Sequence, residues 1–174
     1  MDSFRNKQLF FLFFLFLQFT IEQTSMRKIL FVCHGNICRS PMAEFIMKHL
    51  VMKAGLEDQY YIESAAVSRE EIGNPIYPPA KRCLTKHNIP FDETRTARQV
   101  TKADYDCFDD IICMDQSNLH LIQRIIPFDP EGKIKLMMSF ASRQRDVADP
   151  WYTGDFEKTY DDLIEGCQAY LNDK

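Results

Sequence analysis

The sequence predicts an α/β fold in which a small four-stranded parallel sheet is flanked by helices. Three observations support this class. From residue 28 onward, short apolar segments alternate with segments whose apolar residues recur at helical spacing. The apolar segments are continuous, as in strands that are buried on both faces of a parallel sheet. The length of 174 residues is enough for one domain with a core and too short for two.

Strands and helices are predicted to alternate along the chain. The strands are expected at residues 29–32, 60–62, 110–114 and 133–137. Helices are expected at residues 40–55, 78–87, 118–126 and 155–171, with a brief helical turn from residue 101. This order predicts a three-layer α/β/α sandwich of the flavodoxin-like type.

Most of the predicted helices have a start signal or an apolar face. We expect Ser40 to cap the first helix, with Pro41 as its first residue. Proline lacks the backbone N–H, but at the first helical position that N–H has no partner within the helix. Pro78 opens the second helix in the same way, and Thr101 with Asp104 matches a capping box. The terminal segment has one apolar face, made of Phe156, Tyr160, Leu163, Ile164, Cys167, Tyr170 and Leu171.

Residues 1–25 differ from the rest of the chain. Residues 9–17 are all Leu or Phe, a run shorter than the ~18 residues of a membrane span but typical of the apolar part of a signal peptide. No small-residue cleavage pattern follows the run. Three interpretations stay open: an upstream start codon chosen wrongly, a genuine leader or anchor, or a structural element of the fold. We exclude residues 1–25 from the predicted fold and assign residues 26–174 to one domain.

Composition narrows the classes of function. Hydrophobic residues make up 45% and charged residues 26%, as in ordinary globular domains. The net charge of −4 argues against a nucleic-acid-binding protein, which needs an excess of basic residues to neutralise phosphates. The cysteines form no C-x-x-C pair, and the histidines do not fall at zinc spacing. We therefore expect no nucleic-acid partner and no metal. Four cysteines are expected to be small buried side chains: Cys83, Cys107, Cys113 and Cys167.

The loop after the first strand has the residues for phosphate chemistry. It reads C-x5-R-S from Cys33 to Ser40, at the carboxyl end of a strand, where such sheets place their ligand sites. Its backbone N–H groups lead into a helix N-terminus and form an anion site, and Gly35 lets the backbone bend close to an oxyanion. Arg39 can hold two phosphate oxygens at once. The same dipoles favour the thiolate of Cys33, and Ser40 either donates to that thiolate or caps the helix.

Residues 32–41, VCHGNICRSP, resemble the signature of the low-molecular-weight protein tyrosine phosphatases. The similarity extends over nearly the whole chain from Met26, through SAAVS at 64–68, IGNP at 72–75, ARQ at 97–99, MDQSN at 114–118 and DPWYTGDF at 149–156. The resemblance implies that residues 26–174 are a phosphatase domain. It also implies hydrolysis of phosphotyrosine in proteins or peptides, and of small aryl phosphates, through a cysteinyl-phosphate intermediate. Inorganic phosphate would be the product, and no cofactor is implied.

The resemblance also implies roles for individual residues. Cys33 would be the nucleophile, Arg39 the clamp on the phosphoryl group and Asp149 the general acid. Expelling a tyrosinate, whose pKa is about 10, requires a proton, and a carboxylic acid fixed by a following proline can deliver it. Asn36 would brace the loop. The residues implied to surround the phosphate are His34, Gly35, Asn36, Ile37, Cys38 and Ser40.

The rim of the expected site departs from the family pattern on one side. Trp151 and Tyr152 are expected to form an aromatic wall that can pack against a phenyl ring. On the opposite rim, residues 69–71 are Arg-Glu-Glu where an aromatic residue is common, which adds charge. Arg95 stands where some members have a histidine that supports the loop asparagine. Two further acid pairs are expected on solvated faces or at helix ends: Asp109-Asp110 and Asp161-Asp162.

Three alternative functions stay open. A thiol-linked arsenate reductase shares the loop but needs a relay pair of cysteines. A protein arginine phosphatase has the same fold. A non-catalytic phosphopeptide-binding module would need Arg39 but neither Cys33 nor Asp149. We expect a cytoplasmic protein, and a secreted or membrane-anchored one only if residues 1–25 are a genuine leader.

Cys38 carries a regulatory prediction. It lies five positions after Cys33 in one tight loop, so the two sulfurs are expected to approach bonding distance. An accessible thiolate is readily oxidised to a sulfenic acid, which a neighbouring thiol can capture as a disulfide. The sequence therefore predicts reversible inactivation by peroxide.

Overall fold

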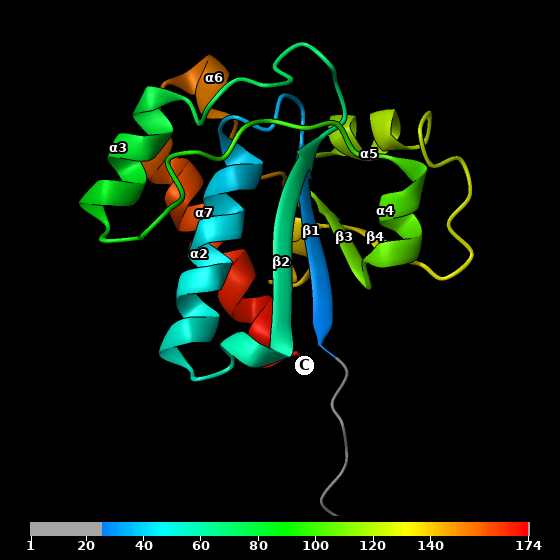
Figure 1. Ribbon diagram of the computed structural model, residues 1–174, viewed down its shortest axis with the longest axis horizontal. Coiled ribbons are helices and arrows are strands. Elements are labelled where there is room, and N and C mark those ends of the chain that lie inside the picture. The colour runs from blue at the N-terminus through cyan, green and yellow to red at the C-terminus, as the bar shows by residue number, and fades with distance from the viewer. Residues whose placement is uncertain (1–25, 174) are drawn as a thin grey trace, which may run out of the picture.

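The computed structural model describes residues 26–173, so the interpretations of residues 1–25 lie outside the described residues. The strands are β1 (Arg27–Cys33), β2 (Tyr60–Ala66), β3 (Asp110–Cys113) and β4 (Ile134–Leu136). All neighbouring strands are parallel, and their order is β2-β1-β3-β4 (Figure 1). The predicted four-stranded parallel sheet is confirmed.

Helices cover both faces of the sheet. One face carries α2 (Arg39–Lys53), α3 (Pro78–Lys86) and α7 (Phe156–Asn172), and the other carries α4 (Lys102–Cys107) and α5 (Gln116–Ile122). Shorter helical segments are η1 (Glu57–Gln59), η2 (Met137–Ser139) and α6 (Pro150–Thr153). The predicted three-layer sandwich is therefore confirmed.

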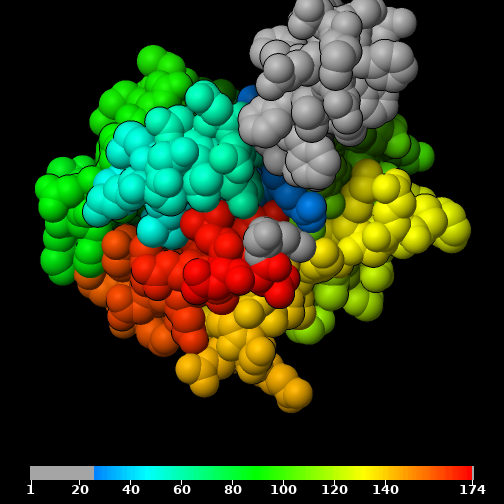
Figure 2. All heavy atoms as spheres, turned by 90° about the horizontal axis from the view of Figure 1, so that it is seen from below, coloured from blue at the N-terminus to red at the C-terminus, as the bar shows by residue number. Residues whose placement is uncertain are grey.

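The apolar residues of β1 pack alternately into two cores, one on each face of the sheet, as expected of an interior strand. Ile29 and Phe31 pack in the core beneath α2 and α7, whereas Leu30 and Val32 pack in the core beneath α4 and α5. All four are fully buried, and each such side chain contributes about 1.5–3 kcal/mol through burial. Figure 2 shows the end of the molecule away from the carboxyl ends of the strands, where the last turns of α7 pack beside α2. The opposite end, with the loops that follow the strands, is where the site lies.

The starts of α2 and α5 differ from the prediction, and α5 also ends at Ile122 where the prediction extended to residue 126. Helix α2 begins at Arg39 with Cys38 at the N-cap position, so the expectation that Ser40 caps this helix is wrong. The Ser40 hydroxyl lies next to the Cys33 thiol and is used there. Helix α5 starts two residues earlier than expected because Asp115 caps it, accepting a hydrogen bond from the backbone N–H of Asn118 at 2.6 Å.

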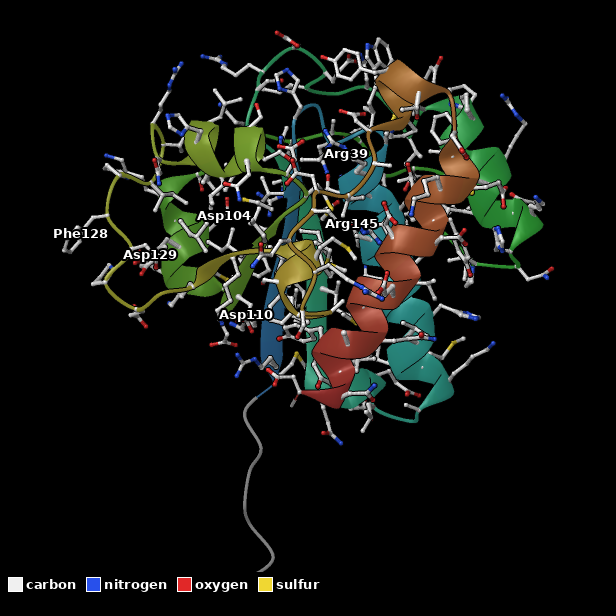
Figure 3. The ribbon with its side chains drawn as sticks, turned by 180° about the vertical axis from the view of Figure 1, so that it is seen from behind. Arg39, Asp104, Asp110, Phe128, Asp129 and Arg145 are labelled. Atoms are coloured by element: carbon white, nitrogen blue, oxygen red, sulfur yellow. The ribbon has the colours of Figure 1, made fainter. Side chains whose placement is uncertain are left out.

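Asp110 is buried, in contrast to the expectation of a solvated position. Its side chain accepts hydrogen bonds from the Tyr170 hydroxyl at 2.6 Å and from Arg27 Nε at 2.9 Å. Burial alone would raise the pKa of Asp110, but these hydrogen bonds outweigh it and lower the pKa below its ordinary value. Figure 3 labels Asp110 on the sheet. Its neighbour Asp109 is exposed, as expected.

Asp162 is the second buried acid where a solvated one was expected. Its side chain is 1% exposed and forms ion pairs with Arg145 at 2.7 Å and with Lys158 at 2.5 Å. Arg145, labelled in Figure 3, comes from the loop before α6, so the ion pair ties that loop to α7. Asp161 is exposed. The pattern of two consecutive acids did not separate the buried member of each pair from the solvated one.

The cysteines differ in one respect from the prediction. Cys83, Cys113 and Cys167 are buried as expected, but Cys107 is exposed at the end of α4. Within residues 26–173, no helix is long and apolar enough to cross a membrane.

Candidate active site

The loop between β1 and α2 is held from both sides by backbone hydrogen bonds. The N–H of Val67 donates to the carbonyl of Cys33 at 2.9 Å, and the N–H of Ser68 donates to the carbonyl of His34 at 3.0 Å. From the start of α3, the N–H of Tyr77 donates to the carbonyl of Ile37 at 2.9 Å. The loop therefore has a fixed shape at the carboxyl end of the sheet.

Cys33 ends β1 and is 3% exposed. Its Sγ accepts a hydrogen bond from the backbone N–H of Asn36 at 3.2 Å and lies 3.0 Å from Ser40 Oγ. Because Asn36 Nδ2 donates to Ser40 Oγ at 2.8 Å, the Ser40 hydroxyl can point its own proton at the sulfur. The Asn36 N–H and the Ser40 hydroxyl are thus the two groups that can donate to the Cys33 sulfur, as the first predicted role of Ser40 requires. The carbonyl oxygen of Ala65, 3.3 Å from Ser40 Oγ, is the other acceptor within reach of that hydroxyl.

Asn36 is the buried centre of the loop. Its φ of 59° is in the left-handed region, which asparagine tolerates better than most side chains. Its Oδ1 accepts hydrogen bonds from the Arg95 side chain and from the Arg98 N–H, the latter at 3.1 Å. Its Nδ2 donates to Ser64 Oγ at 3.0 Å. The contacts of Asn36 thus include Arg95.

Gly35 lies where the loop passes close to the rim segment at residues 69–71. The positive φ in this loop belongs to Asn36, while Gly35 is outside the left-handed region. A Cβ at Gly35 would lie 3.0 Å from Cγ of Glu71. A side chain at position 35 would therefore displace the Glu71 side chain, because the rim segment crosses close to the loop.

Arg39, the first residue of α2, is held between two carboxylates. Its Nη1 lies 2.5 Å from Asp115 Oδ2, and its Nη2 lies 2.5 Å from Asp149 Oδ2. Burial alone would lower the pKa of Arg39, but the charges of Cys33, Asp149 and Asp115 outweigh it and raise the pKa. Arg39 is therefore a permanent buried cation near the carboxyl ends of the strands (Figure 3).

Asp149 is positioned by the structure around it. Its Oδ1 accepts a hydrogen bond from the backbone N–H of Trp151 at 3.0 Å and so caps α6. The preceding residue, Ala148, donates from its N–H to Asp162 Oδ2 at 3.0 Å and accepts from Thr159 Oγ1 at 2.9 Å. Two residues of α7 thus fix the backbone next to Asp149 and leave its Oδ2 directed at Arg39.

These groups surround one cavity of about 170 Å³. Its lining consists of Cys33, His34, Gly35, Ile37, Cys38, Arg39, Glu70, Glu71, Asp149, Trp151 and Tyr152. Two predicted residues, Asn36 and Ser40, are fully buried and do not line the cavity. Trp151 and Tyr152 are 58% and 85% exposed, so they form a wall open to solvent and are not part of the core. His34 lies at the rim of the cavity, where its Nε2 is 3.1 Å from Glu70 Oε2.

Three polar residues that support the site were not assigned roles from the sequence. Asp115 holds Arg39, Ser64 contacts Asn36, and Glu44 accepts a hydrogen bond from Ser64 Oγ at 2.6 Å. Asp115 follows β3 closely, and Ser64 lies in the second half of β2. The rule that sites lie at the carboxyl ends of parallel strands was applied only to the first strand, and it would have indicated Asp115 as well.

Comparisons with known proteins agree with this geometry. A family model described as "Low molecular weight phosphotyrosine protein phosphatase" matches residues 28–173. A curated protein of that name from Gallus gallus is 41% identical over 151 residues, which are 84% of this chain and 94% of that protein. The crystal structure of a low molecular weight protein tyrosine phosphatase from Streptococcus pyogenes is 42% identical, with a TM-score of 0.77, over 85% of this chain and 93% of that one. An arginine phosphatase from Drosophila is 33% identical, with a TM-score of 0.75, over 84% of this chain and 96% of its own.

Proposed function

The chain belongs to the low molecular weight phosphotyrosine protein phosphatase family, and we propose that it hydrolyses phosphotyrosine in proteins through a phosphoryl intermediate on Cys33. The observation that supports this proposal is the placement of Cys33, Arg39 and Asp149 around one cavity. A nucleophile, an anion clamp and an acid are the three groups that displacement at phosphorus needs.

The first step forms the intermediate. The thiolate of Cys33 attacks phosphorus, and the bond from phosphorus to the tyrosyl oxygen breaks. Asp149 gives its proton to that oxygen, so the product leaves as a neutral phenol. The guanidinium of Arg39 and the loop N–H groups stabilise the charge on the three remaining oxygens. Because these groups supply the positive charge, the scheme needs no metal ion.

The second step releases inorganic phosphate. Water attacks the phosphorus of the intermediate, and Asp149, now a carboxylate, accepts a proton from that water. The bond between sulfur and phosphorus breaks, and the thiolate of Cys33 is regenerated. The hydrogen bonds from Asn36 N–H and Ser40 Oγ favour the thiolate as the leaving group. The enzyme then returns to its starting state.

The aromatic wall supports phosphotyrosine as the substrate. Trp151 is exposed at the cavity and is supported from behind by Tyr77, with 5.5 Å between the ring centroids. A phenyl ring can therefore lie against an ordered indole while its phosphate reaches Cys33. A phosphoserine side chain is too short to use this wall and would leave the phosphate far from the loop.

Phosphoarginine is a second candidate substrate. Glu70 and Glu71 line the cavity, and their carboxylates can pair with a guanidinium. A relative that is 33% identical is described as an arginine phosphatase.

A substrate panel with the full chain separates the candidates. We expect phosphotyrosine to be hydrolysed with a kcat/KM far above that for phosphoserine or phosphoarginine, and no reduction of arsenate in the presence of thioredoxin. Preferential hydrolysis of phosphoarginine, lost in the Glu70→Gln/Glu71→Gln variant, would establish the second candidate in its place. Arsenate reduction would identify the reductase alternative.

We propose that the enzyme works in the cytoplasm. The six cysteines of the described residues are all free thiols, which suits a reducing compartment. Fractionation of the native protein tests this proposal, since a functional leader in residues 1–25 would place the product in the membrane or the secreted fraction.

A further inference from the structure

A group of three ligand-type side chains lies between α3 and α7, outside the active-site cavity. Cys83 and His87 are one helical turn apart at the C-terminal end of α3, and Glu157 is the second residue of α7. Figure 1 shows α3 beside the N-terminal half of α7. His87 Nε2 lies 2.8 Å from Glu157 Oε2, and Cys83 Sγ lies 3.8 Å from Glu157 Oε1. The sulfur, nitrogen and oxygen all lie within 4.8 Å of one another.

We propose that Cys83, His87 and Glu157 form a binding site for a zinc-type divalent cation, with water as the fourth ligand. Zinc takes thiolate, imidazole and carboxylate ligands in a tetrahedron at about 2.0–2.3 Å. Three donor atoms that already lie within 4.8 Å of one another need to move little to reach a common centre. Cys83 gives its proton to solvent as its sulfur binds the cation. One thiolate and one carboxylate then neutralise the two positive charges.

The surroundings orient two of the ligands. The His87 ring stacks on Tyr160 with 3.6 Å between centroids and an interplanar angle of 10°, which fixes the plane of the imidazole. Cys83 is 4% exposed, whereas Glu157 is half-buried, so the group is closed on the protein side and reachable from solvent. Burial and the charge of Glu157 raise the pKa of Cys83 to about 12, and a bound cation would reverse that effect.

Two contacts compete with the cation. The Cys83 thiol donates to the carbonyl oxygen of Phe156, with 3.4 Å between the two atoms, and this hydrogen bond is lost when the thiol gives up its proton. Lys86 Nζ lies 3.0 Å from Glu157 Oε1. The Lys86 side chain is 65% exposed, so it can turn into solvent, and an exposed ion pair of this kind contributes little to stability. The cost of losing it is small against the binding energy of a thiolate–imidazole–carboxylate site. Lysine is therefore a competitor that a zinc-type ion displaces.

The choice of metal follows from the donors. A thiolate and an imidazole favour zinc or cobalt, whereas magnesium and calcium prefer sites made only of oxygen atoms. The sequence did not suggest the site because the third ligand is 70 residues away from His87. Only the packing of α7 on α3 brings Glu157 to the cysteine and histidine.

Cobalt binding to the full chain tests the proposal directly. The Cys33→Ser variant is used as the background, because the active-site thiol could itself bind the metal. We expect one Co²⁺ per chain with a thiolate-to-cobalt charge-transfer band, displaced by Zn²⁺ and unaffected by Mg²⁺. Absence of the band would overturn the proposal, and so would its displacement by Mg²⁺.

Matched variants locate the metal. Adding Cys83→Ser to the background is expected to abolish the band, whereas adding Cys107→Ser, at an exposed cysteine, is expected to leave it unchanged. A band that survives Cys83→Ser would place the metal on another thiol and contradict the proposal. His87→Gln and Glu157→Gln change partly exposed side chains and should leave the fold intact. Each is expected to weaken Zn²⁺ binding at least about tenfold, and unchanged affinity in both would also contradict it.

Discussion

Asp149 and Arg39 are in direct contact, with 2.5 Å between Asp149 Oδ2 and Arg39 Nη2. A bound phosphoryl group and Asp149 therefore compete for the same guanidinium nitrogen. Asp115 holds the other side of the guanidinium and can keep it in place while Asp149 turns to the leaving group. The proposed acid and the proposed clamp are thus one coupled unit.

Asp149→Asn tests the role of the acid. Asparagine can still accept the hydrogen bond from the Trp151 N–H, so α6 should keep its cap. We expect kcat for aryl phosphates with poor leaving groups to fall about 10²–10⁴-fold, and kcat for those with good leaving groups to fall far less. The measurement is the dependence of kcat on leaving-group pKa. An equal loss for all esters would make Asp149 a structural residue.

Asp115→Asn tests the positioning of Arg39. The substitution keeps the cap of α5 but removes a charged partner, and a hydrogen bond to a charged group is worth about 1.5–3 kcal/mol. We expect inorganic phosphate to bind roughly 10- to 150-fold more weakly, with an unchanged dependence on the leaving group. Isothermal titration with phosphate and the leaving-group series together measure both. A changed leaving-group dependence would show that Asp115 takes part in proton transfer.

Asp162→Asn tests the link between α7 and the Asp149 loop. Burial alone would raise the pKa of Asp162, but hydrogen bonds from Lys158, the Ala148 N–H and Arg145 lower it. Because the pKa of Asp162 is lower in the folded than in the unfolded protein, the ionised side chain stabilises the fold at every pH above the unfolded-state pKa of about 3.9. This stabilisation is lost as the pH falls through the folded-state pKa. We therefore expect the free energy of unfolding of the variant to be about 1–3 kcal/mol lower than that of wild type at pH 7. Below about pH 4 the difference between the two free energies should be smaller.

Asp161→Asn is the matched control for that experiment, because Asp161 is exposed and adjacent. Urea unfolding at both pH values should show no loss for this control. The Asp162→Asn variant should also show a lower kcat, since Ala148 loses a charged acceptor next to the acid. Equal stability of the two variants would contradict the assigned anchoring role.

Cys38→Ser tests the predicted disulfide. Burial and the charge of Cys33 raise the pKa of Cys38 to about 12, so Cys38 is a neutral thiol that cannot replace Cys33 as nucleophile. It can still capture a sulfenic acid on Cys33, more slowly than an ionised thiol would. We expect wild type treated with peroxide and then with a reductant to recover activity, and Cys38→Ser to stay inactive. If both proteins recovered activity equally, Cys38 would not protect Cys33 from irreversible oxidation, and the predicted disulfide would be contradicted.

The sequence predicted the fold well where apolar pattern and chain direction decide it. The continuous apolar segment at Ile29–Val32 predicted a strand covered on both faces, and the structure buries all four of its residues. The short helix α6 was not predicted, because four residues after Asp149 carry too little periodicity to indicate a helix. Local signals also could not show that Asp110 and Asp162 are buried, since their partners lie elsewhere in the chain.

The site was predictable to the extent that it is local. Residues 33–40 are contiguous, so the loop and its chemistry follow from their order. Asp149 was found only through the resemblance of its segment to the family. The bracing of Asn36 by Arg95 and Ser64 depends on long-range contacts, and the resemblance indicated only that Arg95 would differ from the histidine of other members.

The most direct test of the central claim is the turnover and phosphate affinity of the Cys33→Ser variant, measured beside Arg39→Ala. If Cys33 is the nucleophile, Cys33→Ser should bind inorganic phosphate with nearly wild-type affinity and show no measurable hydrolysis of phosphotyrosine. Arg39→Ala should lose both properties, because the anion clamp serves binding as well as catalysis. Substantial hydrolysis by Cys33→Ser would contradict the cysteinyl-phosphate mechanism.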